Sequence, residues 1–413
     1  MEFKVRSLAK RFLFYKKSKN AKRGKWVILY AFNGLSAPLF SLLLSVIVVK
    51  RISLAFWGEY VSLSLVAGLV TIVLGWGNKD FLVREFSRNP SRITFNWQIS
   101  LIQRLALCLL LSSFFLFFNY SYYRISLLIS WIIGSFLYKS FDALILYKRA
   151  FPFSLITEIS GYAIPIGVAA FCNPDDISVD FLILLFAGLS FLKFILSAWY
   201  FRRDIFPVLY STPGVFLKTN TLLLSLPYFL PMIAGFIQSK IDSYGVVYFL
   251  SPSEIAKYQI FMNALFVPHS FATFIVLPFI KNIYRLPAKS IKKIIHFMTR
   301  FGLVSSLPAI IMIYLIIEKY YKFELPVWMY VLGYINLIPF FIYFIKMNLL
   351  LKYDKQYVIV WIIAFTGVVS FLMSVLLIPY FTITGAIIAH LVTQWVTLLL
   401  YSIYSKRYAR VKG

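Results

Sequence analysis

The sequence predicts an all-α integral membrane protein of about twelve transmembrane helices, arranged as two lobes of six helices each. Three observations lead to this fold class. Of the 413 residues, 61% are hydrophobic and only 14% are charged, whereas a soluble domain has about 25% charged residues. The hydrophobic residues form long runs, and the basic residues lie between those runs. The net charge of +27 therefore does not indicate nucleic-acid binding, which would need the basic residues on one surface.

Twelve segments are apolar and long enough to cross about 30 Å of hydrocarbon, which takes about 20 helical residues. Their connections are short, so consecutive helices are expected to be antiparallel neighbours. The predicted spans cover residues 26–49, 57–78, 95–118, 124–146, 151–171, 179–201, 221–248, 256–280, 295–317, 325–349, 356–379 and 381–404.

The longest connection, residues 202–220, contains Pro213 and Gly214 and divides the chain. It is expected to link an N-terminal lobe, residues 26–201, to a C-terminal lobe, residues 221–404. A cytoplasmic location for this linker agrees with its Arg202–Arg203 pair, because cytoplasmic loops of membrane proteins are rich in Lys and Arg.

Both ends of the chain are basic tails. Residues 1–25 contain ten Lys or Arg and a single acid, Glu2. The apolar run that follows is longer than the ~7–15 residues of a signal peptide, so this tail is expected to stay in the protein and to contact anionic lipid headgroups. Residues 405–413 form the second basic tail.

The distribution of basic residues predicts the orientation. With the N-terminus and the C-terminus both in the cytoplasm, most Lys and Arg lie in cytoplasmic segments, as expected. The acidic loop over residues 173–180 then falls outside. The outer loops would contain only five basic residues: Lys50, Arg51, Arg124, Lys319 and Lys322.

A short internal repeat supports the division into two lobes. Ile52-Ser53 and Glu59-Tyr60 join the first two predicted spans, and Leu250-Ser251 and Lys257-Tyr258 join the seventh and eighth, at a constant offset of 198 residues. Repeats at corresponding places in two halves are common in transporters, which bind substrate between the halves.

Five ionisable residues are predicted to share a layer near the cytoplasmic side of the N-terminal lobe. Such groups at membrane depth cost about 2.5–3.5 kcal/mol each on insertion scales and usually face a cavity. One interpretation is a cationic cavity wall for an anionic headgroup. The other is a set of structural ion pairs, including one between Lys139 and Asp142, which are three residues apart on one predicted helix face. In that interpretation Arg104 and Lys193 extend to the cytosolic surface. The five residues are Arg104, Lys139, Asp142, Glu158 and Lys193.

The predicted seventh span contains Lys240 and Asp242, which lie about 200° apart around a helix. They are therefore not expected to pair with each other, and at least one should reach a polar cavity or a partner on another span. His269 and His390 fall near the middle of their predicted spans. Each is interpreted either as a hydrogen-bonding group between helices or as part of a proton relay.

No motif in the sequence indicates covalent chemistry. There is no phosphate-binding glycine-rich loop, no zinc-binding cluster and no Gly-x-Ser-x-Gly elbow. Cys108 and Cys172 are interpreted as small apolar side chains. We therefore expect no enzyme activity, no catalytic residue, no cofactor and no metal.

Two regions carry a resemblance to a known family. The stretch from Lys50 to Tyr60, followed by Gly75-Trp76-Gly77 and by Phe81 to Phe86, resembles the opening of Wzx-type polysaccharide flippases, which flip O-antigen repeat units. The stretch from Gln238 to Asp242, with Ala256-Lys257-Tyr258, is similar to the family's seventh span. Two features depart from the pattern: Ala55-Phe56 stands where Gly-Pro is usual, and Lys240 stands where Arg is usual. Lys acts as a point charge and lacks the bidentate geometry of Arg.

The resemblance implies membership of the multidrug/oligosaccharidyl-lipid/polysaccharide exporter superfamily. It implies a transporter of the bacterial inner membrane that flips an undecaprenyl-diphosphate-linked oligosaccharide to the outer leaflet by alternating access, for O-antigen, lipopolysaccharide or capsule-type polysaccharide. Expected partners are this anionic lipid-linked substrate, membrane lipids, and a polysaccharide polymerase with its chain-length machinery, but no nucleic acid. Small polar residues of the first and eighth predicted spans either line the transport cavity or serve helix packing: Asn33, Ser36, Ser41, Asn263 and Ser270.

Three alternatives remain open from the sequence. A multidrug or ion antiporter of the same superfamily would prefer acidic residues in its cavity, and a structural membrane protein would not need Lys240 or Asp242 at membrane depth. A membrane-embedded polymerase or ligase would need a sizeable outer loop, and no outer loop here exceeds roughly ten residues. The sugar and the coupling ion are left open.

Overall fold

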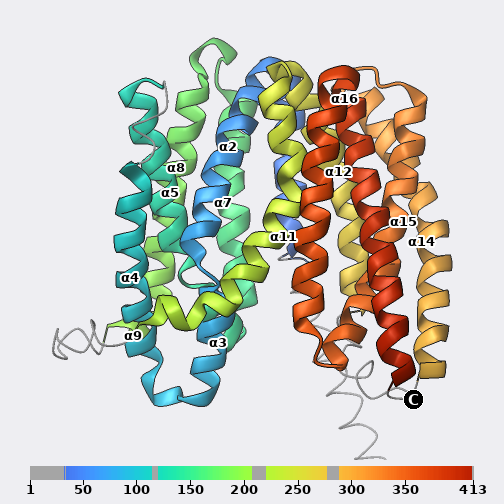
Figure 1. The fold of residues 1–413 in the computed structure, drawn as a ribbon. Helices are drawn as coiled ribbons and strands as arrows, with labels where there is room; N and C mark the ends of the chain where they lie inside the picture. Colours follow the sequence, from blue (N-terminus) through green and yellow to red (C-terminus); the bar gives the residue numbers. More distant parts are fainter. Residues whose placement is uncertain (1–31, 33, 114–119, 207–219, 277–287, 412–413) are drawn as a thin grey trace, which may run out of the picture.

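The computed structural model describes residues 32, 34–113, 120–206, 220–276 and 288–411. Within these residues the chain is helical apart from its turns, and the helices form two bundles side by side (Figure 1). The predicted fold class, an all-α membrane protein with two lobes, is confirmed. The predicted N-terminal tail and most of the linker over residues 202–220 lie outside the described residues.

The N-lobe begins with a first helix, Gly34–Arg51. It continues with longer helices joined by short helical segments. Two of these segments, α6 and α9, are only one or two turns long. The elements are α2 (Leu54–Gly75), α3 (Asn78–Arg88), α4 (Ile93–Ser113), α5 (Tyr122–Lys139), α6 (Asp142–Lys148), α7 (Phe151–Phe171), α8 (Val179–Tyr200) and α9 (Arg202–Ile205).

The C-lobe consists of α11 (Thr221–Phe249), α12 (Pro252–Val276), α14 (Ala288–Ile316), α15 (Val327–Lys352) and α16 (Gln356–Val411). A short π-helix, Ile317–Tyr321, follows α14. Helix α16 is two limbs in one element, because Thr382 interrupts it with φ 49° and ψ −131°, three residues after Pro379.

Ten helices among the described residues are long and apolar enough to span a membrane. One of these ten is α16, whose two limbs run in opposite directions (Figure 1). Helix α12 is not among the ten, but its 25 residues run the height of the C-lobe. When the two limbs of α16 are counted separately and α12 is included, the described helices give the twelve crossings that the sequence predicts.

The two ends of the bundle differ in charge. We call the end with the α7–α8 and α11–α12 turns the upper end, and the end with α3, α9 and the C-terminus the lower end (Figure 1). Turns at the lower end contain Lys148, Arg149, Arg202 and Arg203, whereas the upper α7–α8 turn contains Asp175 and Asp176.

The lobes pack together at the upper end through α2 and α12. Gly58 of α2 lies so close to the start of α12 that a Cβ there would be 1.7 Å from the Pro252 carbonyl oxygen. The Tyr321 hydroxyl lies 2.5 Å from Ser45 Oγ of the first helix. The two repeated segments predicted from the sequence thus meet across the lobe interface, because α2 and α12 are the helices that follow them.

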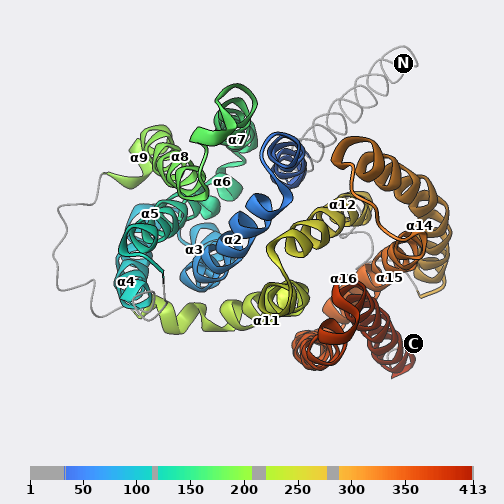
Figure 2. The ribbon, with the colours of Figure 1, turned by 90° about the horizontal axis from the view of Figure 1, so that it is seen from above.

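At the lower end, α11 crosses from the C-lobe to the N-lobe (Figures 1 and 2). Pro227 and Pro231 lie in this first half of α11, where the missing backbone donors allow a helix to bend. Phe229 stacks on Trp76 with ring centroids 4.1 Å apart, and the Trp76 indole donates a 2.9 Å hydrogen bond to the Leu222 carbonyl oxygen.

A tight turn between α2 and α3 makes this crossing possible. Trp76 and Gly77 both have positive φ, 48° and 63°, and Gly is the residue that adopts this region at no steric cost. A Cβ on Gly77 would also lie 2.5 Å from the Phe229 backbone nitrogen. The Gly75-Trp76-Gly77 sequence therefore forms the surface that receives α11.

Candidate functional site

Helix α11 presents two different faces to the two lobes. The Tyr244 hydroxyl donates a 3.0 Å hydrogen bond to the Leu65 carbonyl oxygen of α2, so this face is turned toward the N-lobe. Lys240 lies one turn before Tyr244 and therefore shares its face. Asp242 lies on the opposite face and points into the C-lobe. The predicted separation of Lys240 from Asp242 around the helix is what the structure has.

Lys240 is a half-buried ammonium on the face turned toward the N-lobe. Its Nζ lies 5.1 Å from the centre of the Phe266 ring of α12, a cation–π contact. Among the described residues no carboxylate oxygen lies within 4.0 Å of this Nζ. An ammonium at membrane depth without an anionic partner is a candidate contact for an anionic ligand.

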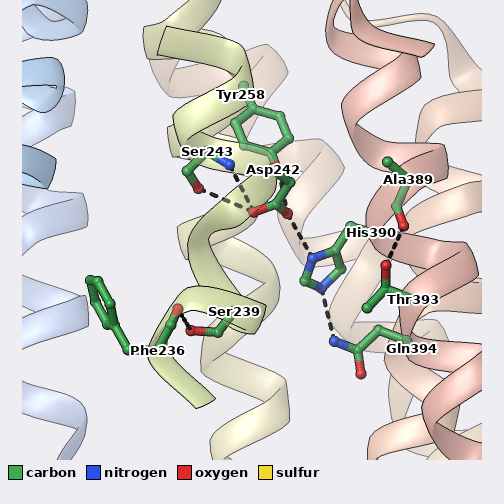
Figure 3. A network of polar contacts seen from close by, with 9 residues as sticks. All are labelled: Phe236, Ser239, Asp242, Ser243, Tyr258, Ala389, His390, Thr393 and Gln394. Atoms are coloured by element: carbon green, nitrogen blue, oxygen red, sulfur yellow. Dashed lines mark hydrogen bonds and ion pairs between the residues drawn. The ribbon is translucent and has the colours of Figure 1, made fainter. Parts of the chain in front are cut away.

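Asp242 is buried at the centre of a polar network that joins three helices (Figure 3). The Tyr258 hydroxyl of α12 donates a 2.6 Å hydrogen bond to Oδ2. The His390 Nδ1 of α16 lies 2.7 Å from the same oxygen, and the Ser243 backbone N–H donates to Oδ1 at 2.8 Å. These donors satisfy the carboxylate, as a buried charge requires.

The network continues to Gln394, whose Nε2 lies 3.2 Å from His390 Nε2 (Figure 3). A neutral imidazole that donates from Nδ1 accepts at Nε2, so the amide donates there. If His390 gains a proton, the amide must turn so that its oxygen accepts instead. That oxygen has no hydrogen-bond partner among the described residues. A rotation of the Gln394 amide therefore lets it hydrogen-bond with His390 in either the neutral or the protonated form.

His269, the other residue predicted for a proton relay, makes no hydrogen bond to this network among the described residues. It is buried between the rings of Phe266 and Phe340, at centroid distances of 6.0 and 5.0 Å. Its Nε2 has no hydrogen-bond partner among the described residues. The structure thus brings His390, but not His269, into hydrogen-bonding contact with Asp242.

Arg104 of α4 is buried within the N-lobe. Its guanidinium donates to the Ser100 carbonyl oxygen at 3.1 Å and lies over the Phe136 ring at 5.2 Å. Its Nη2 has no hydrogen-bond partner among the described residues. The interpretation that Arg104 extends to the cytosolic surface is wrong, because only 3% of the residue is exposed.

Lys139 and Asp142 do not form the predicted ion pair within the described structure. Lys139 ends α5 and Asp142 begins α6, so the two residues are not on one continuous helix. The prediction failed because the apolar run over residues 124–146 gives no signal for the break at Ser140-Phe141.

Lys193 and Glu158 form an ion pair instead, with Nζ 2.8 Å from Oε2. Both residues line a cavity of about 390 Å³ inside the N-lobe, together with Lys139 and Asp142. Among the described residues this lining has two cations and two anions, so it is balanced in charge. Arg104, the third cation of the predicted layer, is not among the lining residues.

The small polar residues predicted for a cavity have varied positions. Asn33 lies outside the described residues. Asn263 accepts a 3.0 Å hydrogen bond from Gln259 on its own helix, and the Ser270 hydroxyl donates to the Phe266 carbonyl oxygen. Ser36 is buried, and Ser41 is half-buried in the first helix.

Several residues at these sites were not predicted. Tyr258 contacts Asp242, and Tyr60, its counterpart at the offset of 198, lines the N-lobe cavity. The repeat named both tyrosines, so their matched positions were a usable signal. The aromatic residues Trp131, Tyr162 and Phe186 at the same cavity had no signal, because aromatic residues are frequent throughout this chain.

Solved transporters share this architecture. A structure described as the lipid II flippase MurJ in an inward closed conformation has a TM-score of 0.68 at 14% identity, covering 92% of this chain and 87% of that chain. A multidrug resistance MATE family transporter of the MOP superfamily has TM-scores of 0.61 for its inward-facing form, over 93% of this chain and 100% of that chain, and 0.60 for its outward-facing form, over 94% and 95%. Both have 12% identity to this chain.

The chain has the fold of MOP-superfamily transporters. No family model and no curated protein matches its sequence. At these identities the likeness concerns the fold, so the cargo of this MOP-fold protein has to be argued from its own residues. These neighbours are described as a flippase and as multidrug resistance transporters.

Proposed function

We propose that this MOP-fold protein flips a lipid-linked oligosaccharide with an anionic diphosphate headgroup from the cytoplasmic to the outer leaflet. The observation that carries the proposal is the position of Lys240. Lys240 lies at membrane depth on the same face of α11 as Tyr244, which contacts the N-lobe. Its ammonium has no carboxylate within 4.0 Å among the described residues. A diphosphate supplies the missing counter-charge and forms charge-assisted hydrogen bonds with an ammonium. The lipid tail needs no protein site, because it stays in the bilayer.

Alternating access would use the two lobe contacts described above. We infer that the lower end is cytoplasmic, because its turns are basic. In the present conformation α2 and α12 close the upper, outer end at Gly58 and Pro252. Opening that end would separate this contact, and the bent first half of α11 would carry the change between the lobes.

The Asp242 network supplies a candidate coupling element. His390 and Tyr258 hold the carboxylate from two other helices, so a change in the protonation of the Asp242–His390 pair alters contacts among α11, α12 and α16. Lys240 is two residues from Asp242 on α11. We infer that proton uptake at the pair is coupled to the position of α11.

The rival function is export of cationic drugs, since the MATE neighbour is described as a multidrug resistance transporter. A cationic drug would meet the ammonium of Lys240, which has no carboxylate partner in the described part of the chain and repels it. Like charges at short range in a poorly screened site disfavour binding.

The test is reconstitution in proteoliposomes with a fluorescent undecaprenyl-diphosphate-linked saccharide, its leaflet reported by an impermeant quencher. The native protein should accelerate exchange between the leaflets. Lys240→Gln should reduce the rate about tenfold, as for the loss of about 1.4 kcal/mol of binding energy, and Lys240→Arg should retain it.

The matched control is Lys257→Gln, which also removes an ammonium over an aromatic ring, 5.8 Å from that of Phe323. It should leave the rate unchanged. Efflux of ethidium from the same vesicles without movement of the saccharide lipid would replace the flippase proposal by the rival.

A further inference from the structure

The N-lobe contains a cavity separate from the face of Lys240. Its volume is about 390 Å³, toward the small end of ligand pockets, which are about 300–1,000 Å³. Helices α5, α7 and α8 supply most of its wall, and the first helix and α2 each add one residue, Ala37 and Tyr60. The first helix and α2 also contact the C-lobe, so the cavity lies behind the helices at the lobe interface.

One wall of the cavity consists of aromatic rings. Tyr60 stacks with Trp131 and with Phe186, at centroid distances of 6.0 and 5.5 Å. Trp131 and Phe186 are 5.6 Å apart, and Tyr162 meets the Phe186 ring edge-on at 6.0 Å. This wall offers broad apolar faces whose π-electrons attract positively polarised C–H groups.

The cavity lining also contains polar side chains. The Lys193–Glu158 pair supplies donors and acceptors. Ser135 and Ser190, whose hydroxyl oxygens are 3.2 Å apart, add two more groups that both donate and accept. With Lys139 and Asp142, the part of the lining that the structure describes holds equal numbers of cations and anions.

The ion pair is held in place by its surroundings. Lys193 lies across Gly161 of α7, where a Cβ would be 2.1 Å from Lys193 Cε. Its ammonium lies 5.3 and 5.7 Å from the rings of Tyr138 and Tyr162. Gly161 therefore makes room for the lysine stem, and the two rings fix the direction of the ammonium.

We propose that this N-lobe cavity binds one or two uncharged sugar rings. A pyranose has apolar C–H faces for the aromatic wall and a rim of hydroxyls that both donate and accept. Glu158 accepts from such hydroxyls, Lys193 donates to them, and the serines do both. A balanced lining gives no net attraction to a diphosphate or to a cationic drug. The inference rests on the proposed function in one respect: the sugar is that of the lipid-linked cargo.

The first experiment measures sugar binding without transport. Methyl glycosides of glucose, galactose, rhamnose and N-acetylglucosamine are added to the full-length protein in nanodiscs, and saturation-transfer NMR reports contact. At least one glycoside should give a signal with the native protein and with Lys240→Gln. Trp131→Leu should abolish it, and Trp131→Phe should restore it, because the phenyl ring keeps an aromatic face. No signal from any glycoside with the native protein would overturn the proposal.

The second experiment separates the two proposals in proteoliposomes. Tyr162→Leu should slow flipping of a glycosylated undecaprenyl diphosphate about tenfold relative to bare undecaprenyl diphosphate. The control Trp361→Leu removes an exposed ring of α16 that stacks on Phe365 and should slow neither. Equal slowing of both lipids by Tyr162→Leu would assign the ring a structural role and overturn the sugar site. Glycoside binding without flipping of either lipid would overturn the proposed flippase and leave the sugar site standing.

Discussion

At the scale of single residues, α11 separates two charges that have different tasks. Lys240 faces the N-lobe without a carboxylate partner among the described residues, and Asp242 faces the C-lobe with three donors around it. The sequence predicts this separation, because the angle between two positions of a helix is fixed. It does not predict that His390, 148 residues later, holds Asp242, since partners across a fold depend on how the helices pack.

Replacing Asp242 should uncouple transport from the proton gradient. Asp242→Asn keeps the side-chain shape but removes the charge, so the Asp242–His390 pair no longer exchanges a proton. We expect native flipping to respond to an imposed pH difference and the variant to be insensitive to it. Asp204→Asn, at the lower-end pair with Lys148, is the control and should respond like the native protein. A pH response that survives in Asp242→Asn would contradict the coupling role.

Tyr258→Phe tests the same network more gently. It removes one hydrogen bond to the carboxylate and should lower stability by about 1 kcal/mol. Thermal denaturation in detergent measures the change. Flipping should persist with a shifted pH dependence, and an unaltered pH profile would show that the tyrosine contributes to packing alone.

Replacing one residue of the Lys193–Glu158 pair should lower stability more than replacing both. Glu158→Gln leaves Lys193 without its carboxylate partner and should destabilise the N-lobe by about 1–3 kcal/mol. Adding Lys193→Met removes the unpaired ammonium and should recover part of that loss, because neighbouring residues of one pair are not additive. The measurement is a double-mutant cycle on thermal denaturation. Strictly additive effects would contradict the pairing.

At the scale of helices, the predicted spans match the structure wherever the apolar pattern decides the element. The prediction fails where a helix breaks within an apolar run. The α5–α6 break after Lys139 lies in such a run, and nothing in its local pattern distinguishes it from a continuous helix. The turn at Trp76-Gly77 is easier to explain from the sequence, because glycine adopts a positive φ without a steric cost.

Helix α2 should fail to close against α12 if Gly58 carries a side chain. A Cβ there would overlap the Pro252 carbonyl, so Gly58→Leu should shift the protein toward a form that is open at the upper end. Spin labels at Tyr122→Cys and Tyr248→Cys, both exposed at the upper end of opposite lobes, would report the distance after Cys108 and Cys172 are replaced by Ala. The distance distribution should lengthen relative to the same labels on native Gly58. Identical distributions would show that this contact does not hold the outer end closed.

At the scale of the whole molecule, the composition indicates membrane-spanning helices, and the short repeat indicates that they form two lobes. The repeat also matches Tyr60 with Tyr258, and the structure places the first in the N-lobe cavity and the second beside Asp242. What the sequence does not reveal is that the charged cavity lining of the N-lobe is balanced, while α11 turns toward the other lobe a cation with no carboxylate partner in the described part of the chain. That distinction depends on where the side chains point. Spacing along the chain does not determine which side chains of different helices meet.

Binding of bare undecaprenyl diphosphate to the full-length protein in nanodiscs tests the role of Lys240 most directly. Its affinity should fall about tenfold in Lys240→Gln, the equivalent of ~1.4 kcal/mol, and stay within about threefold in Lys240→Arg. Lys257→Gln should bind like the native protein. Unchanged affinity in Lys240→Gln, or an equal loss in Lys257→Gln, would contradict a diphosphate site between the lobes.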